Sequence, residues 1–365
     1  MKIKRKRKDD CQYDLLSLGE VMLRLDPGEG RVRTTRSFKV WEGGGEYNVA
    51  RAMKKCFNKR SAVVSVLVKN EVGKLIEDLI LQGGVDTQLI KWKDFDGLGR
   101  SARNGINFTE KGFGVRGALG CSDRGHTAIS QLKPGDIDWD KIFYDGVRWF
   151  HTGGIFAGLS ENSPLVILEA MESAKSHGTT ISYDLNYRQS LWKSVGGQKA
   201  CQEINNKIIE HTDVVFGNEE DFTTCLGFEV EVIDKNYMSL PIEGFKSMVN
   251  DVSKKYQNLK IIGTTLRSVQ HAGINDWGAI AWKKNEGFFQ SMFLSDLPIY
   301  DRVGGGDGFA SGMIYGIMED LGLEKAINYG VAHGALAMTT PGDTSMVSLE
   351  EVIRLTENPN SRVIR

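Results

Sequence analysis

The sequence predicts an α/β protein built on a mainly parallel β-sheet, and three observations support this. Short apolar runs alternate with amphipathic stretches of 10–15 residues, which is the pattern of βαβ units. Runs such as AVVSVLV (62–68) are almost continuously apolar, as in parallel strands that are buried on both faces. The 365 residues include 41% hydrophobic and 25% charged residues, which are the proportions of a globular protein.

The apolar runs are the predicted strands, and the stretches with helical periodicity between them are the predicted helices. Strands are expected at Tyr13–Leu18, Ala62–Val68, Val147–Thr152, Thr180–Asp184, Val214–Gly217 and Leu259–Thr265. Helices are expected at Glu46–Phe57, Glu71–Gln82, Ser163–Ser176, Gly197–His211, Ile242–Tyr256, Asp307–Leu321 and Glu324–Met338. This alternation predicts a doubly wound sheet, whose ligands bind beyond the carboxyl ends of the strands.

Two segments interrupt the alternation and are expected to form a separate small sheet. Residues 22–41 are polar and arginine-rich, and residues 100–121 are similar and rich in glycine. Each could form strands with one solvent-facing side, so we expect the two to meet as a β lid over one edge of the core. The α/β core would then comprise residues 13–21, 42–99 and 122–365.

Charge and cysteine content disfavour several classes of protein. Lys and Arg number 46 and Asp and Glu 47, so we expect no nucleic-acid partner, which would require a basic face. No window approaches 20 consecutive apolar residues, so we expect no membrane span. The five cysteines form no CxxC pair, which disfavours a disulfide framework and favours a cytoplasmic location. Residues 1–12 carry six positive charges in the first eight residues and are expected to be a flexible tail.

The run DRVGGGDGF (301–309) carries the strongest chemical signal. Three successive glycines, Gly304, Gly305 and Gly306, precede a predicted helix, so their amides and the helix N-terminus can surround an anion such as a phosphoryl group. Asp307 beside them could accept a proton from an attacking alcohol. The alternative is that Asp307 only caps the helix and the glycines only form a tight turn.

Three further polar clusters follow predicted strands or open predicted helices. Gly43-Gly44-Gly45 opens a helix that carries Asn48, and Arg188 follows a strand at a place where it could bind a carboxylate or phosphate. Asn218 and Asp221 follow the next strand and offer oxygen ligands that suit Mg²⁺. The alternatives are a surface ion pair for Arg188 and an acidic first helical turn for the Asn218 cluster.

These motifs, in this order, resemble the PfkB/ribokinase family of carbohydrate kinases over about residues 13–352. The segments LGEVM (18–22), DLNYR followed by LW, and TPGD (340–343) are similar to the 2-keto-3-deoxygluconate kinase branch. The resemblance implies a ribokinase-like Rossmann-type core with a β lid. It also implies ATP-dependent phosphorylation of a sugar or sugar-acid hydroxyl, with Mg²⁺, and dimerisation through the lids.

The resemblance also assigns roles to individual residues. Asp307 would be the general base and Gly304, Gly305 and Gly306 the anion hole, while Gly43, Gly44 and Asn48 would face the sugar. Arg188, with Arg116 or Arg124 of the lid, would face a substrate carboxylate. Asn218 and Asp221 would lie near Mg²⁺ and the phosphates, and Thr265, Arg267 and His333 would border the nucleotide. Asp301 would help to hold a monovalent cation.

The chain departs from the family pattern mainly at positions that would recognise the sugar. Arg302 replaces the usual Thr, Asp221 stands where many relatives have Glu, and Cys121-Ser122-Asp123-Arg124 replaces an expected Tyr-Asp-Arg. A tyrosine is expected near Asn107, and none is there. A kinase for a neutral ketohexose or a nucleoside therefore stays open, as does a non-catalytic sugar or nucleotide sensor. The GFGVRG run (112–117) matches GxGxxG outside a βαβ unit and is interpreted as a lid turn.

Overall fold

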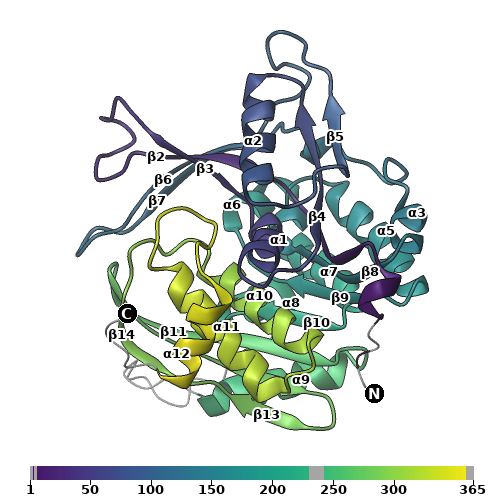
Figure 1. Ribbon diagram of the computed structural model, residues 1–365, viewed down its shortest axis with the longest axis vertical. Helices are drawn as coiled ribbons and strands as arrows, with labels where there is room; N and C mark the ends of the chain where they lie inside the picture. Colours follow the sequence, from purple (N-terminus) through teal and green to yellow (C-terminus); the bar gives the residue numbers. More distant parts are fainter. Residues whose placement is uncertain (1–2, 4–5, 230–241, 359–365) are drawn as a thin grey trace.

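The computed structural model describes residues 3, 6–229 and 242–358, and in that part of the chain the centre is a ten-stranded β-sheet (Figure 1). Seven strands run parallel in the order β11-β10-β9-β8-β1-β4-β5, and β12, β13 and β14 continue the sheet with antiparallel pairing. These strands are β1 (Tyr13–Leu18), β4 (Ser61–Val68), β5 (Ile90–Lys93), β8 (Val147–Gly153), β9 (Thr180–Asp184), β10 (Val214–Gly217), β11 (Ile261–His271), β12 (Ile274–Lys283), β13 (Gly287–Gln290) and β14 (Leu294–Pro298). The predicted fold class is confirmed.

Helices cover both faces of this sheet (Figure 1). One face carries α1 (Gly45–Lys55), α2 (Glu71–Gln82), α10 (Gly305–Met318), α11 (Leu323–Ala337) and α12 (Leu349–Glu357). The other face carries α3 (Trp139–Tyr144), α4 (Gly154–Ala157), α5 (Ser163–Ser176), α6 (Gln189–Trp192), α7 (Gly197–Ile209), α8 (Glu219–Leu226) and α9 (Ile242–Lys255). Successive strand residues such as Leu15 and Leu16 enter the two opposite cores. Among the described helices, none is long and apolar enough to cross a bilayer.

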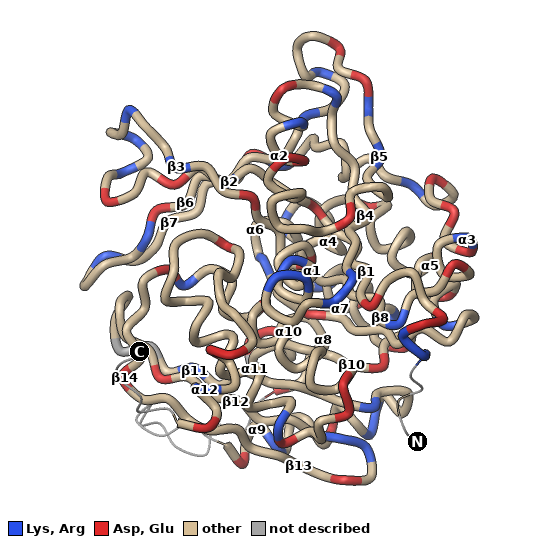
Figure 2. The backbone as a smooth tube through the Cα atoms, viewed as in Figure 1, with Lys and Arg blue, Asp and Glu red and all other residues tan. Residues whose placement is uncertain are grey.

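A separate four-stranded sheet projects beside the core, and we call it the lid sheet (Figure 1). Its strands are β2 (Met22–Asp26), β3 (Lys39–Gly43), β6 (Ile106–Glu110) and β7 (Leu119–Asp123), in the order β3-β2-β6-β7. β3 and β7 each run two residues beyond the predicted segments. The lid sheet has two hairpins, β2–β3 and β6–β7, and Figure 2 shows basic positions on both. The basic residues of their turns are Arg31, Arg33, Arg36, Lys111 and Arg116.

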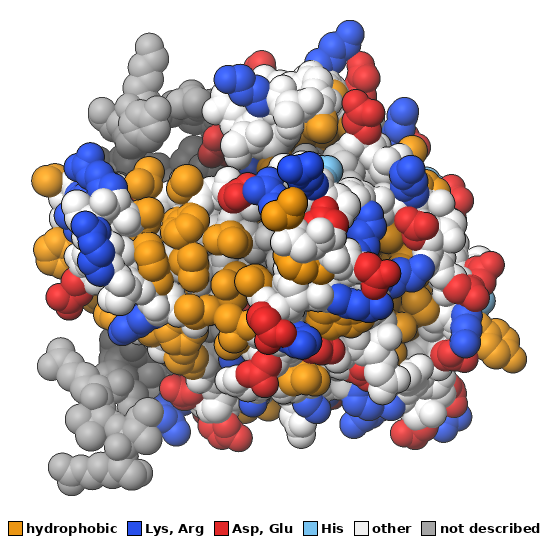
Figure 3. All heavy atoms as spheres, turned by 90° about the horizontal axis from the view of Figure 1, so that it is seen from above, with side chains coloured by type: hydrophobic (Ala, Val, Ile, Leu, Met, Phe, Trp, Pro, Cys, Tyr) orange, Lys and Arg blue, Asp and Glu red, His pale blue; other side chains and the backbone are white. Residues whose placement is uncertain are grey.

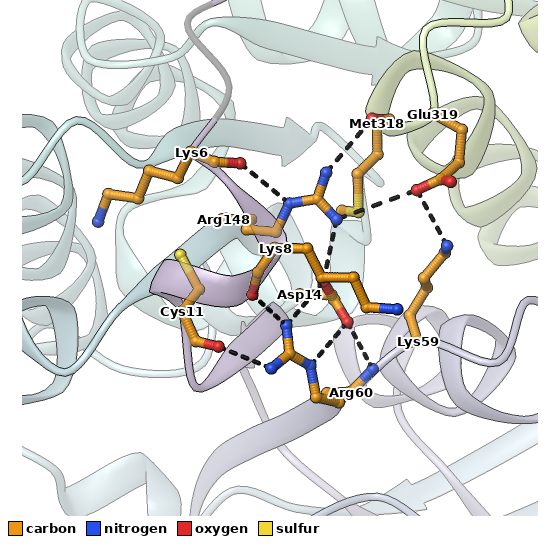
Figure 4. Close-up of polar contacts among 9 residues, drawn as sticks. All are labelled: Lys6, Lys8, Cys11, Asp14, Lys59, Arg60, Arg148, Met318 and Glu319. Carbon is orange, nitrogen blue, oxygen red and sulfur yellow. Dashed lines mark hydrogen bonds and ion pairs between the residues drawn. The ribbon is translucent and has the colours of Figure 1, made fainter.

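The N-terminal segment, for which the sequence predicted a flexible tail over residues 1–12, contacts the core from residue 6 onward (residues 1, 2, 4 and 5 lie outside the described part). Cys11 is buried, and a 3-10 turn spans Lys8–Asp10. Figure 4 shows why this segment is held: Arg60 donates hydrogen bonds to the carbonyls of Cys11 and Lys8, each at 2.7 Å. The sequence pattern showed a run of charge, but not the buried acid around which this segment is organised.

That acid is Asp14, which is completely buried. Its carboxylate accepts hydrogen bonds from the Arg60 side chain at 3.1 Å and from Arg148 Nη1 at 2.9 Å (Figure 4). Burial by itself would raise the pKa of Asp14, but the hydrogen bonds from Arg60 and Arg148 outweigh it and lower the pKa to about 2. The ionised carboxylate therefore stabilises the fold at neutral pH.

We expect Asp14→Asn to lower the free energy of unfolding by about 2–3 kcal/mol at pH 7, because it leaves Arg148 buried beside a neutral partner. A depressed carboxylate pKa stabilises the fold above the unfolded-state pKa of about 4, and this stabilisation is lost as the pH falls from about 4 to 2. The difference between variant and wild type should therefore shrink in urea denaturation at pH 3. Glu71→Gln, which removes an exposed ion pair with Lys74, is the control and should cost less than about 0.5 kcal/mol.

Candidate active site

The glycine run lies where the chain enters α10, next to the carboxyl ends of the parallel strands. Gly304 is the N-cap of this helix with φ 86°, a left-handed conformation that favours glycine. A Cβ atom on Gly304 would stand 2.3 Å from the carbonyl oxygen of Asp343, so two backbone segments meet closely here. The predicted helix therefore begins two residues earlier than expected, at Gly305, with Asp307 in its first turn.

The amides of Gly305 and Gly306 are available to a ligand. Helical geometry gives the first N–H groups of a helix no acceptor inside the helix. No other described residue accepts a hydrogen bond from these two amides. Gly306 is exposed, and a Cβ built on it would have no atom within 4 Å. Open space therefore lies beside unpaired donors at the positive end of the α10 dipole, an arrangement that could bind an anion.

Asp307 is buried beside this space, with 8% of its surface exposed. Its Oδ2 accepts a 2.7 Å hydrogen bond from Nδ2 of Asn48 in α1, 259 residues away in sequence. Burial raises the pKa of Asp307 to about 6, while the Asn48 hydrogen bond and the positive charge of Arg188 lower it. The carboxylate is therefore poised to take up a proton near neutral pH.

The turn from β3 into α1 brings Asn48 to Asp307. A Cβ on Gly44 would stand 2.0 Å from the carbonyl oxygen of Glu20, so only glycine fits there. A Cβ on Gly45 would come within 3.5 Å of Asp307 Oδ1 and Asn186 Nδ2, which places these three residues around one space. A Cβ on Gly43 would collide with the Asp343 carboxylate at 2.1 Å. Gly43 and Gly44 thus fix the backbone that carries Asn48.

Further charged side chains lie around Asp307 at the ends of β9 and β10. Asp184 ends β9, and its pKa is raised well above the usual value by burial and by the nearby Asp221 and Asp307. Arg188 is exposed and lowers the pKa of Asp184, Asp221 and Asp307 alike, so its positive charge faces all three carboxylates. Arg188 Nη1 donates a 3.0 Å hydrogen bond to the Tyr187 carbonyl, and no described carboxylate lies within 4 Å of the guanidinium as an ion-pair partner.

Two buried glutamates near the site were missed in the sequence. Burial raises the pKa of Glu46 to about 7, and its Oε2 has no partner among the described residues. Glu20 pairs with Arg124 at 2.6 Å through Oε2, while its Oε1 also lacks a partner. Glu46 directly follows the glycine run, and that position was the only sequence signal. Arg124, which the sequence suggested for a substrate carboxylate, pairs its charge with Glu20.

Asn218 and Asp221 form the N-terminal capping box of α8. Asn218 Oδ1 accepts the Asp221 N–H at 2.9 Å, and Asp221 Oδ2 accepts the Asn218 N–H at 2.9 Å. Asp221 Oδ1 accepts a third amide, that of Tyr187. These oxygens already accept amide protons, so the pair suits water-mediated contact with Mg²⁺ better than direct coordination. No described group of three or more His, Cys, Asp or Glu side chains is arranged to hold a metal.

The residues predicted to border the nucleotide divide into two groups. Thr265 and Arg267 lie on the same face of β11 as Gly263. A Cβ atom built on Gly263 would stand 3.1 Å from Met313 Sδ, so at Gly263 this face is turned toward α10. The prediction for His333 is wrong, because its side chain is completely buried in α11. Its Nδ1 contacts Ser311 Oγ and its Nε2 contacts Ser345 Oγ, so it joins α10, α11 and the following loop.

Two other predictions concern Asp301 and Arg116. Asp301 does not offer a free carboxylate to a monovalent cation, because Arg24 Nη2 pairs with Asp301 Oδ2 at 2.5 Å. Arg116 lies exposed in the β6–β7 turn, where its backbone pairs with Phe113 in both directions. Gly112 and Ala118 of the same turn line a cavity with Asp301, Arg302 and Val303. The contact between Arg24 and Asp301 joins residues 277 positions apart and had no local sequence signal.

Similarity to known proteins places the chain in a family. A family model described as pfkB family carbohydrate kinase matches residues 147–350. The chain is 26% identical over 353 residues to 2-dehydro-3-deoxygalactonokinase of Haloferax volcanii, covering 96% of this chain and 99% of that protein. It is 26% identical to 5-dehydro-2-deoxygluconokinase of Geobacillus kaustophilus, covering 90% and 88%. The crystal structure of 2-dehydro-3-deoxygluconokinase from Thermotoga maritima superposes with a TM-score of 0.85 and 34% identity, covering 94% and 99%.

Proposed function

The chain belongs to the pfkB family of carbohydrate kinases and is a phosphotransferase, and we propose that it phosphorylates a sugar acid of the 2-keto-3-deoxygluconate type with ATP. The observation that carries the proposal is the juxtaposition at the start of α10. There a buried carboxylate with a pKa of about 6 lies beside unpaired amides that face open space. A base and a nest of donors are what phosphoryl transfer to an alcohol requires.

In the proposed reaction, Asp307 accepts the proton of the sugar hydroxyl as its oxygen attacks the γ-phosphorus of ATP. The bond between the γ-phosphorus and the β–γ bridging oxygen breaks, and ADP leaves with the electron pair. The N–H groups of Gly305 and Gly306 stabilise the charge on the transferred phosphoryl group. Asn48 holds the Asp307 carboxylate in place by its 2.7 Å hydrogen bond. When bound, Mg²⁺ would screen the remaining phosphates near the Asn218 capping box.

A substrate carboxylate is the expected partner of Arg188. This guanidinium is exposed, lies within electrostatic reach of Asp307, and donates a hydrogen bond to the neighbouring Tyr187 carbonyl. Arg–carboxylate pairing is geometrically specific, so an acid would be oriented with its hydroxyl toward Asp307. The three kinases compared above, by their names, act on oxidised deoxy sugars or sugar acids, which supports the same class here.

The direct test is ADP release measured with a panel of 2-keto-3-deoxy sugar acids, neutral ketohexoses and nucleosides. We expect turnover with a sugar acid, and we expect Arg188→Gln to raise its KM more than it lowers kcat. The same substitution should leave any residual activity on a neutral ketohexose unchanged. Preference for a neutral sugar or nucleoside would overturn the proposed substrate class. Binding without turnover on every compound would indicate a sensor instead of a kinase.

The pKa of Asp307 predicts the pH dependence of the reaction. The base must be ionised, so kcat/KM should rise with pH through about 6 and fall about tenfold per pH unit below it. Asn48→Ala removes the hydrogen bond that favours the ionised form, so its acidic limb should move to higher pH. Initial rates between pH 5 and 8 measure the wild-type pH profile and its shift in Asn48→Ala. A flat wild-type profile across this range would exclude Asp307 as the titrating base.

We also propose that two copies pair through the outer face of the lid sheet. Leu25, Val40, Phe108 and Cys121 are register partners across its four strands and therefore form one row on one face. Val40 and Cys121 are exposed, and Figure 3 shows hydrophobic side chains gathered on the surface seen from above. Light scattering after size exclusion should give twice the monomer mass, and Val40→Glu should give the monomer. A monomeric wild type would contradict this proposal.

A cytoplasmic location fits the cysteine content. All five cysteines are free, and four of them are buried. Because free thiols persist in a reducing compartment, we propose that the enzyme acts in the cytoplasm. Cell fractionation with an antibody against the chain would test this.

A further inference from the structure

A buried arginine stands between the lid sheet and the anion-hole loop. Arg24 lies in β2 and is 1% exposed. Its Nη2 contacts Asp301 Oδ2 at 2.5 Å, and its Nη1 contacts Asp343 Oδ1 at 2.5 Å. Nη2 also contacts Asp26 Oδ2 at 3.2 Å. A single guanidinium therefore joins three carboxylates that come from three distant parts of the chain.

Two of these carboxylates shape the loops around the anion hole. Asp301 accepts hydrogen bonds from the amides of Val303 at 3.2 Å and Gly342 at 3.3 Å. The carbonyl of Asp343 is the group that Gly304 approaches so closely that a Cβ would stand 2.3 Å from it. Arg24 thus holds together the two backbone segments, 301–304 and 342–343, that set the position of the donor amides.

The charge balance requires a cation at this point. Asp26, Asp301 and Asp343 are all buried, and together they would carry three negative charges beside a site that must accept a polyphosphate. Burial raises the pKa of Asp343, and the guanidinium of Arg24 lowers it again by charge and by hydrogen bonding. Burial lowers the pKa of Arg24, but the charges and hydrogen bonds of Asp343 and Asp301 outweigh it and raise the pKa, so the positive charge of Arg24 is permanent.

The resemblance to the family led us to expect a monovalent cation at Asp301, and the residues present do not fit one. Both Asp301 oxygens are engaged, one by Arg24 and the Gly342 amide and the other by the Val303 amide. Asp343 is also paired with Arg24, through its Oδ1 atom. A potassium ion bound here would have to displace a buried, doubly bonded guanidinium.

We propose that Arg24 is the built-in cation of this site: it replaces a monovalent metal ion and positions the anion-hole loop for phosphoryl transfer. This inference rests on the proposed kinase function. It makes Arg24 a positioning residue, because it acts on the phosphoryl group through Asp301, Asp343 and the amides that they hold. The enzyme would then need no potassium ion, and loss of the guanidinium would affect kcat more than the KM for the sugar.

The first experiment compares wild-type turnover and thermal unfolding in KCl and in choline chloride of equal ionic strength. We expect rates within about twofold and the same melting temperature in both salts. A rise of more than about fivefold in rate with potassium, or a melting temperature raised specifically by potassium, would overturn the proposal. The melting temperature requires no substrate, so the cation inference is tested even if no substrate supports turnover and the kinase proposal itself fails.

The second experiment removes the guanidinium. Arg24→Gln should lower kcat about 10²-fold with the KM for the sugar changed less than about threefold. Guanidinium chloride at low millimolar concentration should restore part of kcat, which a purely structural role would not explain, and Arg24→Lys should retain more activity than Arg24→Gln. Arg103→Gln is the matched control, because it breaks an ion pair with Asp123 of the lid sheet and leaves the contacts of Arg24 in place. Unchanged kcat in Arg24→Gln, or a loss that guanidinium does not relieve in a folded variant, would contradict the proposal.

Discussion

Asp307→Asn is expected to lose turnover by 10²–10⁴-fold, which is the usual contribution of a general base, while keeping the fold. The amide cannot accept the hydroxyl proton, yet its oxygen can still accept the hydrogen bond that Asn48 donates at 2.7 Å. The variant should therefore bind its substrates with KM values close to wild type. Burst and steady-state ADP release, with circular dichroism of the folded variant, measure both properties.

The same variant should gain stability at neutral pH. The pKa of Asp307 is raised to about 6 in the folded state, chiefly by burial, so the folded state binds more protons than the unfolded state between about pH 4 and 6. The free energy of unfolding of the wild type falls as the pH rises through this window. Asn carries no charge and avoids this loss, so Asp307→Asn should melt at a higher temperature than wild type at pH 7–8.

The two enzymes should converge in melting temperature near pH 3, below both pKa values of Asp307, where the carboxyl is protonated in folded and unfolded wild type. An inactive variant that is also less stable at pH 7 would mean that Asp307 acts through the structure rather than as the base. A variant with near-wild-type kcat would remove Asp307 from the mechanism altogether.

The sequence predicted the parallel core well because buried parallel strands carry their signal locally. β1, β9 and β10, and helices α2 and α5, have the predicted bounds. The antiparallel edge formed by β12, β13 and β14 was missed, although its turn residues include Asn285 and Gly287 with positive φ. β13 and β14 are only partly buried and their partners are set by tertiary pairing, so their composition resembles a loop; β12 is mostly buried, but its pairing is likewise set by distant segments.

Site residues were predictable where backbone chemistry determined the type of residue. Gly304, Gly43 and Gly44 stand where a neighbouring backbone or carboxylate leaves no room for a Cβ atom, and Asp307 adjoins the glycine run 304–306. Pairings between distant segments had no such signal: Arg24 with Asp301, and Glu20 with Arg124, depend on how the lid sheet docks. His333 was misassigned because a buried histidine and a ligand-facing one look alike in a sequence.

Substitutions at two adjacent glycines, Gly306 and Gly305, test the anion hole most directly. Gly306 is exposed, has no left-handed φ, and a Cβ on it would have nothing within 4 Å. Gly306→Ala should therefore fold with an unchanged melting temperature. Its new methyl group would nevertheless project into the space proposed for the phosphoryl group, so we expect kcat to fall about 10²-fold. Steady-state ADP release and thermal unfolding measure the two effects separately.

Gly305→Ala provides the matched control at the neighbouring position. Its Cβ would point toward Met338, 2.9 Å from the Sδ atom of a flexible side chain, and away from the open space. We therefore expect a small loss of stability, under about 1 kcal/mol, and kcat within a few-fold of wild type. The two substitutions add the same methyl group to adjacent residues of one helical turn, so only its direction differs. Equal kcat values for the two variants would mean that the transferred phosphoryl group does not lie where the open side of Gly306 places it.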